Sequence, residues 1–313
     1  MRTWQRKAWL GGILIGLVLT LTAGYVVWRG AGGDAGAQAG SLNLNRSGTL
    51  LYVEGGAVVQ STMDGQRMIA TGPSCARAYA AGGTLACLRG LGRRFSAELE
   101  VYGGGGRNEL TLPLWGIPSR VRVSGSGNLV GWTVFREGDS YLANGAFSTT
   151  AGIYDLRTGA HYGSLEDFHP LVDGSPYQRQ DVNYWGVTFA GDDRTFYVTM
   201  SSAGGTWLMR GDLATRTLTA LRRNVECPSL SPDGTRIAYK KRSGQRWRLH
   251  VLDLATGTDT ALAEPDHVDD QPAWLDRRTI GYTKPGPAVF AVPADGDGAP
   301  RRLTAGASPS SVR

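Results

Sequence analysis

Two short segments decide the fold: residues 228–239, PSLSPDGTRIAY, and residues 249–257, LHVLDLATG. The turn at 231–235 (SPDGT) combines proline, aspartate and glycine, and each of these residue types favours a tight turn for its own steric or hydrogen-bonding reason. The apolar run that follows at 236–239 predicts a strand. The second segment is another strand, and it ends in a second turn at 253–257. Together the two segments predict a unit in which strands and turns alternate.

This unit is repeated along the chain. Counterparts of the first turn precede strands at residues 47–49, 82–84, 126–128, 192–194 and 275–278. Counterparts of the second turn lie at residues 62–65, 103–106, 155–159, 212–216 and 294–298. The steps along the first series are 35, 44, 66, 41 and 43 residues. Six turns of each kind predict six four-stranded sheets. A sheet of about 40 residues cannot bury both faces alone, so such sheets stack radially. The sequence predicts an all-β, six-bladed β-propeller over residues 41–313.

The repeat resembles that of TolB-like propellers, and residues 270–274 (DQPAW) add a typical blade opening. The match is strong over residues 225–304, moderate over 186–224 and weak over 41–160. The resemblance implies an extracytoplasmic scaffold that binds proteins or peptides. The chain departs from TolB because it leaves no room for the α/β domain that precedes that propeller, which puts a role in a Tol–Pal-type system in doubt. The same blade occurs in prolyl-oligopeptidase-like enzymes, but only nine residues follow Thr304 to hold a hydrolase domain.

The N-terminus predicts export. An uncharged run of 21 residues, Ala8–Trp28, follows Arg2, Arg6 and Lys7. As a helix this run is about 30 Å long, the thickness of a bilayer's hydrocarbon core, and the preceding positive charges keep the N-terminus in the cytoplasm. Two interpretations stay open: an uncleaved single-pass anchor over residues 1–29, or a signal peptide cleaved after Ala39. Either one places the propeller outside the cytoplasm. Residues 30–40 are glycine-rich and predict a flexible tether.

The net charge gives no reason to expect a nucleic-acid partner. The whole chain has 33 basic and 27 acidic residues, a net charge of +6. Four of the basic residues and one acidic residue lie in the first 40 positions, so the remainder has 29 basic against 26 acidic residues, a net of +3. Much of the positive charge therefore belongs to the export signal.

The 66-residue step exceeds the others by about 20 residues, and loops of such length are uncommon unless they are functional. The excess must lie around residues 136–150, around 161–184, or in both places. Two interpretations stay open: a floppy insertion covering one blade, or a rim that contacts a ligand. Aromatic side chains are enriched at interface hot spots. The candidate rim residues are Tyr141, Phe147, Tyr177, Tyr184 and Trp185.

Three cysteines allow one disulfide and one free thiol. Cys75 and Cys87 flank the turn at 82–84 almost symmetrically, so a hairpin folded there would bring them to nearly opposite positions on adjacent strands. An oxidising compartment favours pairing. We therefore expect a Cys75–Cys87 disulfide, although two unpaired thiols remain the alternative. Cys227 would then be a buried, small apolar residue.

No motif for chemistry stands out. The sequence has no G-x-S-x-G elbow, no phosphate-binding loop, and no cysteine–histidine spacing typical of zinc. Six tryptophans recur in the blades, and we expect most of them to pack between blades. We therefore predict no catalytic residues, no cofactor and no metal. The predicted function is non-catalytic binding of a protein, peptide or cell-envelope ligand by a monomer. The alternative is an extracytoplasmic propeller enzyme, lactonase- or lyase-like, with a site on the central axis.

The sequence does not decide how the ring of blades is closed. The first unit has a strand of its own that could serve as its first strand.

Overall fold

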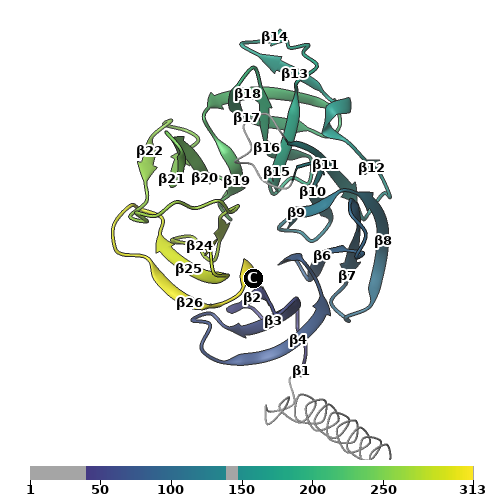
Figure 1. Cartoon of the computed structure of the whole chain (residues 1–313), viewed down its shortest axis with the longest axis vertical. Coiled ribbons are helices and arrows are strands. Elements are labelled where there is room, and N and C mark those ends of the chain that lie inside the picture. The colour runs from purple at the N-terminus through teal and green to yellow at the C-terminus, as the bar shows by residue number, and fades with distance from the viewer. Residues whose placement is uncertain (1–39, 139–146, 313) are drawn as a thin grey trace, which may run out of the picture. The chain divides into compact units, whose positions relative to one another are not determined.

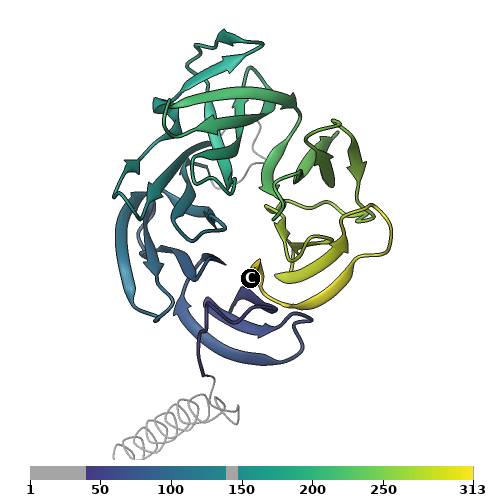
Figure 2. The ribbon, with the colours of Figure 1, turned by 180° about the vertical axis from the view of Figure 1, so that it is seen from behind.

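The computed structural model describes residues 40–138 and 147–312. These residues form six β-sheets arranged around a central axis (Figures 1 and 2). The only helical element in the described residues is a single 3-10 turn, η1 (Leu165–Asp167). The prediction of an all-β, six-bladed propeller is therefore confirmed.

Each blade is built mainly from consecutive antiparallel strands. In order of the blades, the strands are β1 (Gly40–Ser41), β2 (Thr49–Glu54), β3 (Ala57–Thr62), β4 (Met68–Ser74) and β27 (Ala307–Val312) in blade 1; β5 (Arg77–Ala81), β6 (Thr84–Gly90), β7 (Ser96–Tyr102) and β8 (Asn108–Trp115) in blade 2; β9 (Ile117–Val123), β10 (Leu129–Glu137), β11 (Ser148–Asp155) and β12 (His161–Tyr162) in blade 3; β13 (His169–Val172), β14 (Ser175–Pro176), β15 (Asn183–Phe189), β16 (Thr195–Ser202), β17 (Gly205–Asp212) and β18 (Thr217–Arg223) in blade 4; β19 (Glu226–Leu230), β20 (Arg236–Ser243), β21 (Arg246–Asp253) and β22 (Asp259–Ala261) in blade 5; and β23 (Ala273–Trp274), β24 (Thr279–Lys284), β25 (Ala288–Pro293) and β26 (Arg301–Ala305) in blade 6.

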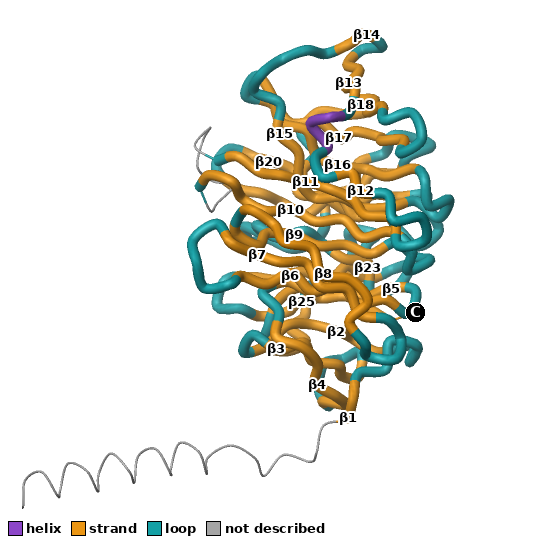
Figure 3. Tube along the Cα trace, turned by 90° about the vertical axis from the view of Figure 1, so that its right-hand side faces the viewer, coloured by secondary structure: helices purple, strands orange, loops and turns teal. Residues whose placement is uncertain are grey.

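The alternating strand direction sorts the connections onto two faces of the ring (Figure 3). Turns that lead into the second and fourth strands of a blade lie on one face, which we call the lower face. Turns between the second and third strands, and the connections to the next blade, lie on the opposite, upper face. Both repeated turn series, exemplified by 231–235 before β20 and 253–257 before β22, are on the lower face. The sequence repeat therefore marks the lower face, and the upper face is built from segments that do not repeat.

Blade 1 takes its innermost strand from the C-terminal end of the chain. β27 pairs antiparallel with β2, with Thr49 opposite Val312 and Leu50 opposite Ser311. The hydroxyl of Ser310 also accepts a hydrogen bond of 3.3 Å from the backbone N–H of Ala80 in blade 2. The expectation that blade 1 supplies its own first strand is therefore wrong. The strand at 49–54 is the second strand of blade 1. The turn before it, at 47–49, belongs to the series that leads into the second strand of each blade. Residues 40–312 contain every strand needed to close the ring.

Large apolar side chains fill the spaces between blades. Trp132 of blade 3, for example, is 1% exposed and packs in one cluster with Leu88 and Leu99 of blade 2. Four further tryptophans are equally enclosed, with exposed fractions of 1–4%: Trp185, Trp207, Trp247 and Trp274. The sixth, Trp115, is different, because 70% of its surface is exposed. The expected role in packing thus holds for five of the six.

The 66-residue step contains additional strands. After β12, the chain forms η1 and then β13, which pairs in parallel with the outer strand β18 of blade 4. β14 pairs with β13 and makes blade 4 six-stranded. Residues 169–176 therefore extend the outer edge of blade 4, and residues 161–162 complete blade 3. Residues 139–146, which belong to the other long loop, lie outside the described residues.

The predicted anchor (1–29), and the tether (30–40) except for Gly40, also lie outside the described residues. Within residues 40–138 and 147–312, no helix combines the length and the apolar character needed to cross a bilayer.

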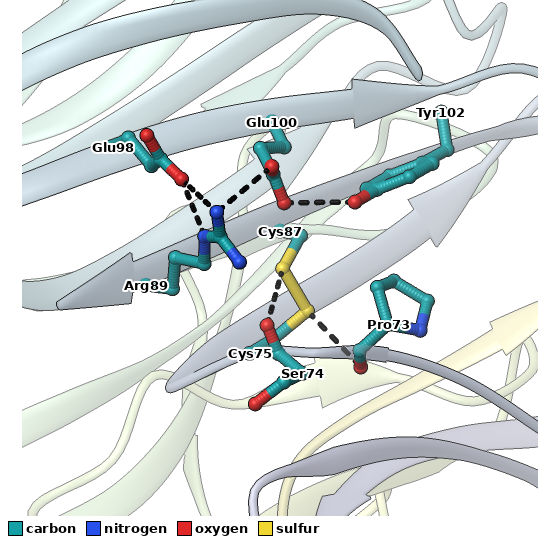
Figure 4. The surroundings of a disulfide bond; sticks show 8 residues. All are labelled: Pro73, Ser74, Cys75, Cys87, Arg89, Glu98, Glu100 and Tyr102. Carbon is teal, nitrogen blue, oxygen red and sulfur yellow. Dashed lines mark hydrogen bonds and ion pairs between the residues drawn. A yellow bond between two sulfur atoms is a disulfide. The ribbon is translucent and has the colours of Figure 1, made fainter. Parts of the chain in front are cut away.

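The predicted disulfide is confirmed. Cys75 and Cys87 are bonded, with 5.4 Å between their Cα atoms, and both are buried (Figure 4). Their placement differs from the expectation, because the residue opposite Cys87 on β5 is Ala78. Cys75 instead lies in the connection between β4 and β5, where its N–H donates to the carbonyl oxygen of Gly56. The bond thus ties the passage from blade 1 to blade 2 onto the second strand of blade 2. Cys227 is a free thiol and is buried, as expected.

Candidate functional site

The central axis is occupied by two arginines from the innermost strand β9. Arg120 and Arg122 are both 7% exposed, and they extend across the ring to blade 6. Arg122 Nη2 donates to the carbonyl oxygens of Pro272 (2.7 Å) and Gln271 (3.3 Å). Arg120 Nη2 donates to the carbonyl oxygen of Asp269 (3.3 Å). The cavity that remains beside them has a volume of about 10 Å³, which is roughly the space of one water molecule.

The axial arginines are held as charged groups in a dry environment. Burial lowers the pKa of Arg122 from its usual value. Its guanidinium lies over the ring of Tyr79, 4.4 Å from the ring centroid, in a cation–π contact. Opposite blades are therefore bridged through the axis by arginine-to-carbonyl hydrogen bonds. A substrate the size of a sugar or a lactone has no room beside them.

The histidines are dispersed over the ring. His161 packs against Trp132 in blade 3, with 5.6 Å between ring centroids and 42° between ring planes. In blade 5, His250 Nδ1 lies 2.9 Å from Asp259 Oδ1, and His267 Nδ1 accepts the backbone N–H of Trp247. Within residues 40–138 and 147–312, no group of three or more histidine, cysteine or carboxylate side chains is arranged to hold a metal ion.

A large open cavity lies on the upper face over blades 3, 4 and 5, and we call it the upper cavity. Its volume is about 930 Å³, within the range of pockets that hold ligands. The cavity is bounded by the ends of β10, β16, β18 and β20 and by the segment that leads into β15. The residues on which the following description depends are Arg136, Glu166, Asp181, Arg223, Asn224, Glu226 and Arg242.

Most carboxylates of the upper cavity are already engaged. Glu166 accepts from Arg136 Nη2 at 2.5 Å. Asp181 accepts the hydroxyl of Ser202 and the N–H of Ala203, each at 2.6 Å. These hydrogen bonds hold the pKa of Asp181 well below its usual range. Both carboxylates therefore organise the wall of the cavity.

The floor is formed between blades 4 and 5. Glu226 is 3% exposed and accepts from Trp247 Nε1 at 2.9 Å. Burial raises its pKa, although the nearby ammonium of Lys240 opposes this shift. The side-chain amide of Asn224 donates to the carbonyl oxygen of Arg242 and accepts its N–H, at 3.0 and 2.9 Å. This bidentate contact joins the end of β18 to β20 and fixes the shape of the floor.

Two arginines on the upper cavity lie flat against tryptophans. The guanidinium of Arg223 is 4.6 Å from the ring centroid of Trp207, and that of Arg242 is 5.3 Å from that of Trp247. A cation–π contact of this kind holds each guanidinium over its ring, and Arg242 Nε also donates to the carbonyl oxygen of Gly244 at 3.3 Å. The lining thus combines arginines from blades 3, 4 and 5 with four carboxylates. The arginines are Arg136, Arg223 and Arg242, and the carboxylates are Glu137, Glu166, Asp181 and Glu226.

A second cavity of about 530 Å³, the side pocket, adjoins the first along blade 4. The two share Glu166, Gln180 and Val182 as lining residues. The hydroxyl of Tyr184 is buried and makes no hydrogen bond to another described residue. Burial raises the pKa of this phenol, so it stays protonated and remains a potential donor. The two cavities together form a continuous depression.

The candidate rim residues can now be placed. Phe147 and Trp185 line the upper cavity, and Tyr177 and Tyr184 line the side pocket. Phe147 and Trp185 contact each other with 5.4 Å between ring centroids. Tyr141 lies outside the described residues. The structure therefore brings four of the five to one depression, where Trp185 and Tyr184 are buried walls and are not exposed contact residues.

Sequence reasoning missed the polar part of the site: Arg136, Glu166, Asp181, Arg223, Asn224, Glu226 and Arg242. A usable signal was present, because several of these residues stand where the second or the fourth strand of a blade ends. Both repeated turn series lie on the lower face. Recognising this from the sequence would have placed the ends of the second and fourth strands on the upper face. Their convergence from three different blades could not be read from spacing.

Comparisons with known proteins agree with this architecture. No family model matches the sequence, and no curated protein matches it. Among solved structures, TolB from Acinetobacter baumannii is 16% identical with a TM-score of 0.63, and the match covers 86% of this chain and 67% of that one. A chain of a nidogen–laminin complex is 12% identical with a TM-score of 0.54, covering 85% and 98%. A structure from Agrobacterium tumefaciens, ascribed to TolB, is 11% identical with a TM-score of 0.50, covering 83% and 90%.

At these identities the likeness concerns the fold. The fold defines a six-bladed β-propeller whose axis is filled and whose open cavity lies on one face. More narrowly, the chain is a TolB-like β-propeller, as the resemblance of its repeat predicted.

Proposed function

We propose that this chain is an exported, membrane-tethered propeller that binds an extended segment of a cell-envelope protein in the upper cavity, without catalysing a reaction. The observation that carries the proposal is the upper cavity itself, about 930 Å³ of open space over three adjacent blades. A rigid ring that presents non-repeating segments on one face is suited to selective binding, because the scaffold holds those segments in fixed positions.

The shape and lining of the depression favour a polypeptide over a small molecule. The cavity is open and continues into the side pocket across Gln180 and Val182. A ligand that fills both must be long, and it must offer polar groups to the arginines and carboxylates of the lining. An extended peptide meets both requirements, because its backbone can lie along the cavity while one side chain enters the side pocket.

The alternative of an axial enzyme, lactonase- or lyase-like, has less support. Such enzymes need carboxylates, histidines or a metal at the axis. In this ring Arg120 and Arg122 extend across the axis, and the nearby carboxylate of Asp269 is paired with Lys240 at 2.5 Å. In the upper cavity, Glu166, Asp181 and Glu226 each accept hydrogen bonds from neighbouring residues. We therefore favour binding over catalysis.

Site-specific photo-crosslinking in cells tests the proposed binding. A photoreactive residue at Ala203, on the upper cavity, should give a discrete crosslinked protein. The matched control is Ala255, which is also exposed but lies in a lower-face turn. We expect no such product from Ala255. Identical products from both positions, or a product from Ala255 alone, would contradict binding in the upper cavity.

The proposed location has its own test. Protease added outside intact cells should digest residues 41–313. Protection of that domain in intact cells, followed by digestion after lysis, would contradict export.

A further inference from the structure

An exposed aromatic tip projects from blade 2. It consists of Leu91, Arg93, Arg94 and Phe95 in the turn between β6 and β7, and of Trp115 at the end of β8; we call it the blade 2 tip. Trp115 is 70% exposed and Leu91 is 45% exposed. The other tryptophans in the described residues are at most 4% exposed. An apolar side chain of this size held in solvent is a feature that marks interaction sites.

The tip is held in shape by its own contacts. The rings of Phe95 and Trp115 stack with 6.3 Å between centroids and 25° between planes. The guanidinium of Arg94 lies 4.9 Å from the centroid of the Phe95 ring. The N–H of Gly116 donates to the carbonyl oxygen of Phe95 at 2.9 Å, and the N–H of Leu91 donates to Ser96 at 2.9 Å. These contacts hold the apolar side chains in place outside the core. Binding a partner would therefore cost little additional side-chain entropy.

The charge of the tip is positive. Arg93 and Arg94 are both exposed, and the described structure contains no ion pair between either of them and a carboxylate. Two of the three acidic residues of the blade are engaged elsewhere, because Glu98 and Glu100 both bind Arg89 (Figure 4). The third, Glu109, lies at the other end of β8 from Trp115. Glu100 also accepts the hydroxyl of Tyr102. Two cations without an ion-pair partner among the described residues therefore flank the exposed Trp115 and the partly buried Phe95.

We propose that the blade 2 tip docks the propeller onto an anionic lipid surface. Tryptophan is favoured at the interface between water and hydrocarbon, where its amphipathic ring lies at the level of the headgroups. Trp115, Phe95 and Leu91 would enter that layer, and Arg93 and Arg94 would bind the lipid phosphates. Each arginine close to an anionic bilayer contributes roughly a factor of five in affinity.

The size of the tip favours a bilayer over a protein partner. Five residues from one turn and one strand end are far fewer than the roughly 20–30 residues that each side of a stable protein interface contributes. A bilayer needs only a small wedge of apolar side chains with cations beside it. The sequence adds a second argument: ten residues separate Arg29 from Gly40, and they can extend at most about 36 Å. An anchored ring would therefore stay close to a membrane.

Docking would also orient the site. The turn between β6 and β7 and the connection between β8 and β9 belong to the upper face, as do the segments around the upper cavity. The tip in blade 2 and the cavity over blades 3–5 would then face the same membrane. This inference does not depend on the proposed binding of a protein segment, because it rests on other residues.

Vesicle sedimentation with the isolated ring, residues 40–313, provides the test, since these residues include every strand needed for closure. The probes are vesicles of phosphatidylcholine alone and of phosphatidylcholine with 30% phosphatidylglycerol. We expect binding to the anionic vesicles and its loss at high salt. The double variant R93A/R94A should bind about 25-fold more weakly, since two charges of a factor of about five each are removed. The matched control is R301A/R302A, an exposed arginine pair on β26.

Tryptophan fluorescence gives a second readout. Brominated lipid should quench the wild-type ring, and Trp115→Ala should remove most of that quenching. The control is Leu221→Ala, because Leu221 is 47% exposed on blade 4 and lies outside the tip. Absence of wild-type binding to anionic vesicles, or equal losses in R93A/R94A and R301A/R302A, would overturn the proposal. A protein crosslink from the tip with vesicle binding unaffected by Trp115→Ala would overturn it in favour of a protein partner.

Discussion

Removing the disulfide should destabilise the ring by a predictable amount. Cys75 and Cys87 are separated by 12 positions, and cross-linking a loop of that length reduces the entropy of the unfolded chain by about 10 cal/mol/K, or about 3 kcal/mol at 25 °C. Both side chains are buried, so the double variant C75A/C87A loses little else beyond a small sulfur volume. For a domain of this size we expect the Tm to fall by roughly 6–12 °C.

Thermal unfolding followed by circular dichroism measures this shift, and alkylation with mass spectrometry counts the thiols. The control is Cys227→Ala, which removes the free buried thiol and leaves the bond intact. After full reduction of unfolded protein and refolding with reductant, the wild type should melt like the double variant, and Cys227→Ala should lose a similar amount. A double variant that melts with the wild type would refute the loop-entropy reasoning. Three reactive thiols in the unreduced wild type would refute the bond itself.

Two further predictions concern the lower-face turns. Gly82→Ala should lower the free energy of unfolding by about 1–3 kcal/mol more than Gly234→Ala does. Both glycines have a positive φ (+55° and +73°), but only at Gly82 would a Cβ lie 2.3 Å from the N atom of Gly127 in the next blade. Equal losses in denaturant unfolding would show that the contact between the turns is not tight. Asp233 accepts hydrogen bonds from Ser231 and Thr235, which lower its pKa to about 2. A carboxylate with a lowered folded-state pKa stabilises the fold above its unfolded pKa of about 3.9 and loses this effect as the pH falls towards 2. The unfolding free energy of Asp233→Asn should therefore depend less on pH between 4 and 2, and an unchanged slope would contradict this role.

The sequence was sufficient for the blades because their turns are local. Residues 231–235 set their own conformation through Pro232, Asp233 and Gly234, so the same residue types at six places could be read as six units. Closure of the ring is not local. β27 and β2 are joined by backbone hydrogen bonds between residues more than 250 positions apart, and the sequence of residues 307–312 carries no turn signal that announces this pairing.

The disulfide shows the limit of local geometry. Its two cysteines were predicted correctly from their proximity along a hairpin. However, Cys75 lies just outside β5, and a connection between two blades, not strand register, brings it to Cys87. The pairing was therefore readable from the sequence, whereas its role in fastening blade 1 to blade 2 required the fold.

The fold class, the number of blades, the positions of the lower-face turns and the identity of the bonded cysteines could all be inferred from the sequence, because each depends on residues within one blade or its immediate connection. What lies on the axis and on the upper face depends on how the blades are assembled. Arg120 and Arg122 meet the carbonyls of blade 6 only because the ring closes, and Arg136, Asp181 and Arg242 surround one cavity only because three blades converge there. Trp115 resembles the other blade tryptophans in sequence, yet it is the one that the closed ring leaves exposed.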